Sequence, residues 1–251
     1  MLESLLVNYS NNYIGGYGMY GLGMYWDPTY FLVLIGVIIS LIASARVKST
    51  FSKYSRQNAR SGMTGAQVAE RLLRANGIND VRIEHVPGNL SDHYDPRSKV
   101  LRLSDDVYGR TSVAAIAVAA HEVGHCIQHD RNYAPLSIRS TLVPIANFGS
   151  TASWFFILAG LFLGSFSWLV NLGIILFSAA VLFQIVTLPV EFNASKRALV
   201  TLKDNGILYD DEINSGRKVL NAAALTYVAA AAAAVLQLLR LVLLFGNRNR
   251  D

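Results

Sequence analysis

Residues 140–190, STLVPIANFGSTASWFFILAGLFLGSFSWLVNLGIILFSAAVLFQIVTLPV, form a run of 51 positions without one charged side chain. A helix needs about 20 apolar residues to cross the hydrocarbon core of a bilayer. The run therefore has room for two spans and a turn, and Asn171 and several glycines lie near its middle. We expect a helical transmembrane hairpin here, with both of its ends on the same side of the membrane.

A second apolar run, residues 29–45, lies upstream of the hairpin and is followed at once by positive charge. No Lys or Arg precedes Arg46, and five basic residues with no acidic one occur between Arg46 and Arg60. A cleaved signal peptide is disfavoured, because its positive charge would precede the apolar run. The positive-inside rule predicts a first span with the N-terminus outside and residue 46 onward in the cytoplasm.

The composition of the whole chain agrees with a membrane protein. Hydrophobic residues make up 52% of the 251 positions and charged residues only 16%, against about 25% in a soluble domain. Of the 22 Lys and Arg residues, 19 lie in residues 46–139 and 191–218, the two segments predicted to be cytoplasmic. The positive charge therefore indicates orientation in a membrane. We expect contact with membrane lipid and no nucleic-acid partner.

These patterns predict a mainly α membrane protein, with a helical bundle of about four spans and a small α+β zincin-like cytoplasmic cap. Within the cap we expect a helix over residues 66–75, strands over 81–86 and 99–103, and a helix from Thr111 or Ser112 to His129. The Ala-rich run 219–245, interrupted by Arg240, is either a fourth span or a helix packed within the bundle. The predicted segments are a Gly/Tyr-rich tail (1–28), a first transmembrane helix (29–45), the cytoplasmic cap (46–139), the transmembrane hairpin (140–190), a second cytoplasmic segment (191–218) and the Ala-rich helix (219–245).

The long cap helix contains His121-Glu122-Val123-Gly124-His125, an H-E-x-x-H motif. Histidines at i and i+4 lie one turn apart on one helix face, so both imidazoles can bind one metal ion. A zinc ion held by few protein ligands keeps a position open for water and lowers the pKa of that water. Glu122, beside the first histidine, is then placed to act as general base and later as proton donor.

A third ligand is needed, and Glu191 is the best candidate. It is the first charged residue after the uncharged run, at the end of the hairpin that returns to the cap. His129 shares the helix face of the motif, but about 12 Å of helix rise separates it from His121, which is too far to share one ion. We therefore expect His129 to be structural or interfacial and Cys126 to be a packing residue.

Four stretches identify the chain more specifically than the motif does, namely residues 91–107, 114–129, 183–197 and 220–230. They resemble the bacterial YugP-type family of neutral zinc metallopeptidases, and the resemblance covers residues 27–244. The motif, the hairpin and the later E-[FY]-x-A pattern also resemble membrane gluzincins of the HtpX and CAAX-prenyl-protease type. The resemblance implies one Zn²⁺ per chain held by His121, His125 and Glu191, with Glu122 as the catalytic residue. In the HtpX-type pattern an Asp orients a ligand histidine, and its place here is taken by Ser195, or its role by Asn193.

The expected function is a zinc-dependent endopeptidase of the bacterial plasma membrane, multi-pass, with its active site facing the cytoplasm and a protein or peptide as substrate. The strand at 99–103 could align an extended substrate by β-addition. Two alternatives remain open: an intramembrane-cleaving zinc protease, and a non-catalytic zinc-binding membrane scaffold or quality-control adaptor. The sequence leaves the physiological substrates, the oxyanion-stabilising residue, regulation, a membrane-protein partner and homo-oligomerisation open.

Overall fold

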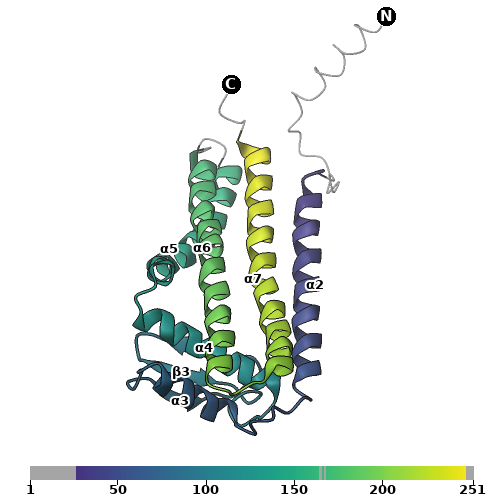
Figure 1. The fold of residues 1–251 in the computed structure, drawn as a ribbon. Helices are drawn as coiled ribbons and strands as arrows, with labels where there is room; N and C mark the ends of the chain where they lie inside the picture. Colours follow the sequence, from purple (N-terminus) through teal and green to yellow (C-terminus); the bar gives the residue numbers. More distant parts are fainter. Residues whose placement is uncertain (1–26, 164–165, 167, 247–251) are drawn as a thin grey trace, which may run out of the picture.

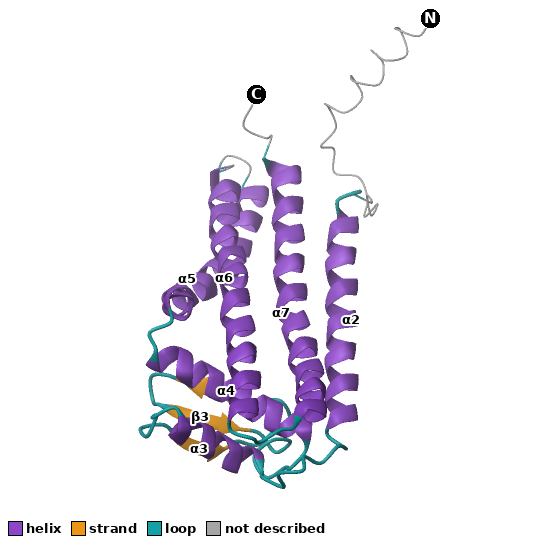
Figure 2. Ribbon diagram, in the orientation of Figure 1, coloured by secondary structure: helices purple, strands orange, loops and turns teal. Residues whose placement is uncertain are grey.

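The computed structural model describes residues 27–163, 166 and 168–246, and within them the chain is mostly helical. Figures 1 and 2 show its helices and one small sheet. The described elements, in chain order, are α2 (Tyr30–Tyr54), α3 (Gly65–Ala75), β1 (Arg82–His85), β2 (His93–Asp95), β3 (Val100–Leu103), α4 (Val113–Asp130), α5 (Ala134–Phe162), α6 (Trp168–Asp204) and α7 (Asp210–Phe245). The expectation of a mainly helical protein with a small sheet is confirmed, whereas the predicted tail lies almost wholly outside the described residues.

Four of the described helices, α2, α5, α6 and α7, are long and apolar enough to cross a membrane. They pack in the order α5, α6, α7 and α2, as Figure 1 shows. Each is longer than the apolar run that predicts it, and α6, with 37 residues, is about 55 Å long. Because the hydrocarbon core is about 30 Å thick, an apolar first part of α6 can fill it while the polar second part extends beyond. The expected segment 191–218 therefore begins as a continuation of α6.

The hairpin turns earlier than its sequence suggests. Helix α5 ends at Phe162 and α6 begins at Trp168, so Asn171 lies inside α6 instead of near the turn. The intervening sequence, Leu-Gly-Ser-Phe-Ser, is rich in the residues that favour turns. The two helices then approach closely, because a Cβ on Gly173 would lie 2.7 Å from the carbonyl oxygen of Ser153. Pro144 lies inside α5, and Figure 1 shows this helix bending away from α6 toward its N-terminal end.

The Ala-rich run belongs to one uninterrupted helix, α7, and its Arg240 has partners at the start of α2. The Arg240 Nη2 atom lies 3.6 Å from Asp27 Oδ2, and the guanidinium carbon lies 4.1 Å from the centre of the Tyr30 ring. The length and hydropathy of α7 agree with a membrane span. A partly buried cation is tolerated in such a helix because a carboxylate and an aromatic face compensate its charge.

The cap lies at the opposite end of the bundle from the start of α2 and consists of α3, the sheet and α4 (Figure 2). Helix α3 is capped by Thr64, whose side chain accepts the Gln67 N–H while the Gln67 side chain accepts the Thr64 N–H. Its apolar face packs against α4, and the fully buried Leu72, Leu101 and Ile116 belong to the common core. This core fixes α4 across the ends of α6 and α7 that face the cap.

The sheet has the order β1-β3-β2, with β1 parallel and β2 antiparallel to β3. The sequence predicts β1 and β3 but only a turn where β2 forms. Asp95 accepts hydrogen bonds from the Arg97 N–H and the Ser98 hydroxyl, which folds the chain back and pairs β2 with β3. The suggestion that the strand at 99–103 pairs with a substrate is wrong, because β3 is the central strand and both of its edges are occupied.

Candidate metal centre

Helices α4 and α6 bring His121, His125 and Glu191 together. One ligand atom from each of the three residues lies within 4.8 Å of the other two. The Glu191 Oε2 atom is 3.2 Å from His121 Nε2 and 3.5 Å from His125 Nε2. Glu191 is buried, and the two histidine side chains are only 13% and 12% exposed. Three residues separated by as many as 70 positions thus form one compact group of donors facing a common point.

The motif glycine explains how the two helices come so close. Gly124 is buried where α4 crosses α6, and a Cβ at this position would lie 2.5 Å from the carbonyl oxygen of Ala194. Such a contact is impossible for any residue with a side chain unless one helix backbone moves. Gly124 therefore sets the spacing at which Glu191, one turn earlier in α6, reaches the two histidines.

Each histidine is held through its second ring nitrogen. His121 Nδ1 forms a 3.1 Å hydrogen bond with Ser195 Oγ, and His125 Nδ1 forms a 3.0 Å hydrogen bond with Gln128 Oε1. The amide nitrogen of Gln128 donates to the Val190 carbonyl at 2.8 Å. A carbonyl only accepts, so this bond fixes the orientation of the amide, and Oε1 must accept the His125 Nδ1 proton. The Nε2 lone pair of His125 is then available to a metal ion.

Ser195 and Asn193 make different contacts around the donors. Ser195 contacts His121 directly. Asn193 contacts neither histidine through these bonds. Its side-chain oxygen accepts hydrogen bonds from Gln128 at 3.1 Å and from Arg197 at 2.7 Å, and Gln128 in turn contacts His125. Gln128 was not singled out from the sequence. The available signal was its spacing of three residues from His125 on a helix predicted to be buried.

Arg139 of α5 is a further residue that the sequence did not single out. Its Nη1 atom lies 3.3 Å from Glu191 Oε1, the carboxylate oxygen that does not face the histidines. Arg139 is the last charged residue before the uncharged run and Glu191 the first one after it. Because the hairpin returns the chain to its starting side, the two residues at its ends meet. That pairing is the signal that could have identified Arg139.

Glu122, the predicted general base, is buried with 8% of its surface exposed. It follows His121 directly in α4 and precedes His125 by three residues, so it neighbours both histidines along the helix. Glu122 is not one of the three residues whose ligand atoms come together, and its place in the motif is next to them in sequence.

The other two residues considered in the motif helix lie apart from the donors. His129 Nδ1 forms a 3.0 Å hydrogen bond with the Tyr94 hydroxyl of β2, which ties α4 to the sheet. Cys126 is 1% exposed, and burial raises the pKa of its thiol far above the ordinary value. An inert, buried thiol is a packing residue.

The donor set fits zinc. Zinc prefers four-coordinate sites of histidine nitrogen and carboxylate oxygen, with bonds of about 2.0–2.2 Å. Donors at neighbouring corners of such a tetrahedron are about 3.3–3.5 Å apart. The separations of 3.2 and 3.5 Å from Glu191 Oε2 to the two histidines agree with this spacing. Three protein ligands leave one position open, which is typical of catalytic zinc sites.

Comparison with known proteins agrees with this chemistry. A family model described as "Putative neutral zinc metallopeptidase" matches residues 29–246. The chain belongs to this family. It is also 50% identical over 221 residues to a Bacillus subtilis (strain 168) protein named "Putative membrane protease YugP", covering 88% of this chain and 97% of the relative. No solved structure matches the chain. The resemblance found in the sequence is confirmed, and membership of the family implies zinc as the cofactor.

Proposed function

We propose that this protein is a membrane-embedded zinc endopeptidase that hydrolyses peptide bonds of protein substrates at the cytoplasmic face of the bacterial plasma membrane. The observation that supports this most directly is the compact group of His121, His125 and Glu191, with Glu122 next to His121 in the same helix. A structural zinc site needs no base and is normally closed by four protein ligands. A base beside a three-ligand site favours hydrolysis.

In the proposed mechanism, His121, His125 and Glu191 hold the ion, while Ser195 and Gln128 fix the two imidazole rings. Bound there, Zn²⁺ would polarise the scissile carbonyl and lower the pKa of a water molecule. Glu122 accepts the proton of that water as it attacks the carbonyl carbon, and it then transfers the proton to the departing amine. Arg139 engages Glu191 Oε1, so that Oε2 remains directed at the histidines.

The edge strand β2, rather than β3, is the element that we propose for substrate alignment. It pairs with β3 along one edge only and lies next to α4. Its Tyr94 contacts His129, two turns beyond His121 on α4. A peptide in extended conformation could therefore add to β2 alongside the motif helix.

The position of α4 argues against cleavage within the membrane. Among the described helices, α4 is not one of those long and apolar enough to span a bilayer. Charged residues stand at both of its ends, with Arg110 before it and Asp130 and Arg131 at its close. If the motif helix lay inside the bilayer, these charged side chains would be in or near the hydrocarbon core, which costs several kcal/mol of free energy. The positive charge of residues 46–139 favours the cytoplasmic side for the same part of the chain.

The variant Glu122→Gln tests the proposal. We expect it to lose at least about 100-fold in the cleavage rate of fluorescein-labelled β-casein by the detergent-purified protein, because the general base is removed. It should still hold one zinc per chain by elemental analysis, whereas Glu191→Ala should hold much less. Glu70→Gln, the same change on the exposed face of α3, serves as the matched control.

Two results would contradict the proposal. One is a Glu122→Gln variant that cleaves as fast as the wild type. The other is wild-type protein that contains zinc yet cleaves neither casein nor membrane-protein substrates in lipid nanodiscs, which would favour the scaffold.

A further inference from the structure

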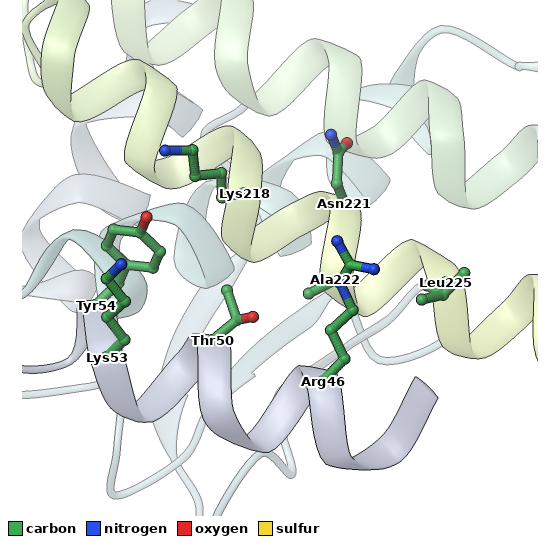
Figure 3. A pocket seen from close by; sticks show the side chains of 8 residues that line it. All are labelled: Arg46, Thr50, Lys53, Tyr54, Lys218, Asn221, Ala222 and Leu225. Carbon is green, nitrogen blue, oxygen red and sulfur yellow. The ribbon is translucent and has the colours of Figure 1, made fainter. Parts of the chain in front are cut away.

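A cationic cavity lies between α2 and α7, near the ends of these helices that face the cap. It has a volume of about 410 Å³. Helix α2 contributes Arg46, Thr50 and Lys53, and helix α7 contributes Lys218, Asn221 and Leu225. Figure 3 shows the side chains of the two helices on either side of the opening, with Arg46 extending from α2 toward α7. None of these residues takes part in the metal centre.

All charged side chains that line the cavity are positive. Three of its lining residues are cations, and no carboxylate lines it among the residues that the structure describes. Thr50 and Asn221 add a hydroxyl and an amide that can donate hydrogen bonds. Three cations that line one cavity without a compensating acid repel one another. An anion with several acceptor oxygens, such as a phosphate group, would relieve that repulsion and could accept hydrogen bonds from side chains of both helices.

The same faces of the two helices become apolar toward the membrane. Stepping back from Arg46 by four, seven and eleven residues gives Ile42, Ile39 and Ile35 on the same face of α2. On α7, Val228 follows Leu225 by three residues, and both Val228 and Ile42 are exposed. From Arg46 to Ile35 the helix rises about 16 Å, close to half of the roughly 30 Å hydrocarbon core. The cavity thus lies where a lipid headgroup would meet one leaflet of acyl chains.

We propose that this cavity binds the phosphate of an anionic phospholipid whose acyl chains lie along the apolar faces of α2 and α7. A soluble phosphate compound would use the cations but leave the apolar faces unused. A zwitterionic lipid would carry a positive group into a cavity that already holds three. The combination of a cationic cavity with an apolar extension one leaflet long therefore fits an anionic lipid best.

The test compares a cavity variant with a variant of equal charge. The first carries Arg46→Gln, Lys53→Gln and Lys218→Gln. The control carries Lys48→Gln, Arg56→Gln and Arg217→Gln, which are exposed cations nearby in sequence that do not line the cavity. Retention of dioleoyl phosphatidylglycerol is measured by native mass spectrometry after detergent exchange and compared with retention of dioleoyl phosphatidylcholine. Zinc content and the melting temperature show that both variants are folded.

We expect the wild type and the control to retain phosphatidylglycerol in preference to phosphatidylcholine. The cavity variant should bind phosphatidylglycerol about 100-fold more weakly, since each cation near an anionic lipid contributes about a factor of five. Excess glycerol 3-phosphate should not displace the lipid. Equal binding by the two variants would overturn the proposal, because the cations would then act only through general charge. Efficient displacement by glycerol 3-phosphate would overturn the lipid as the ligand, and so would equal retention of the two lipids.

Discussion

At the scale of single residues, the proposed metal centre depends on the side chains that hold the two histidines as much as on the three proposed ligands. Ser195 and Gln128 each occupy the second nitrogen of one histidine, so that the Nε2 atoms face Glu191. Such supporting contacts commonly contribute 10- to 100-fold to metal affinity. A hydroxyl at position 195 is a weaker acceptor than the carboxylate of the HtpX-type pattern, yet it satisfies the same nitrogen.

Replacing Ser195 with Ala should therefore weaken zinc binding by about 10- to 100-fold, because His121 loses the contact that fixes its ring. Competition with a zinc-chelating indicator dye measures the dissociation constant. Ser178→Ala is the matched control, since this serine of the same helix donates to the Ile174 carbonyl of its own helix. The prediction would be contradicted if the two alanine variants bound zinc equally well.

The three donor residues could be predicted because each leaves a simple mark in the sequence. His121 and His125 are spaced one helical turn apart, and Glu191 ends a long uncharged run. Gln128 and Arg139 were missed because their roles come from how α4 and α5 pack against α6. Polar residues at such positions are common on ordinary helices, and only the three-dimensional contacts distinguish them.

At the scale of elements, the crossing of α4 and α6 decides whether the donors meet. The contact is backbone against backbone, because Gly124 faces the carbonyl of Ala194. The Gly124→Ala substitution should push the helices apart and cost about 1–3 kcal/mol in stability, the usual range for overpacking. We also expect less zinc per chain, since Glu191 moves away from the histidines.

Gly216→Ala in α7 provides the comparison. A Cβ there would meet its nearest neighbour, Ala117 Cβ, at an ordinary 3.5 Å. Alanine stabilises a helix interior relative to glycine by up to about 1 kcal/mol, so this variant should melt at or above the wild-type temperature. Thermal unfolding in detergent and zinc content measure both effects. A Gly124→Ala variant that melted and bound zinc like the wild type would show that the crossing tolerates a side chain.

Some helices and strands were predicted from the sequence and others were not. The difference is whether an element is formed by contacts between residues near in sequence or by contacts between distant ones. Helices α3 and α4 follow from local signals, namely caps at Thr64 and Ser112 and apolar periodicity. Strand β2 has only three residues and exists because it pairs with β3, which no local pattern reveals. The sequence pointed to a break between α5 and α6 near Asn171, later in the chain than the structure has it. The reason is related, because a uniformly hydrophobic run contains no local signal for where one helix ends.

At the scale of the whole molecule, the cap, the metal centre and the cationic cavity lie at one end of the bundle. The last turn of α5 and the first turn of α6 lie at the other end, together with the start of α2 and the end of α7 (Figure 1). Most of the positive charge is in the segments at the cap end. If this charge fixes the orientation, the cap faces the cytoplasm, and the end of α5 and the start of α6 face outward.

Cysteine labelling tests this orientation directly. Ser98→Cys lies in the turn between β2 and β3 and Phe166→Cys in the α5–α6 connection, and both positions are exposed. The native Cys126 is 1% exposed and should stay unlabelled in the folded protein, so that the unsubstituted chain gives the background. A membrane-impermeant maleimide applied to bacterial protoplasts should label Phe166→Cys at once and Ser98→Cys only after permeabilisation. The reverse pattern would place the metal centre outside the cell, and positive charge would then not determine how this bundle inserts.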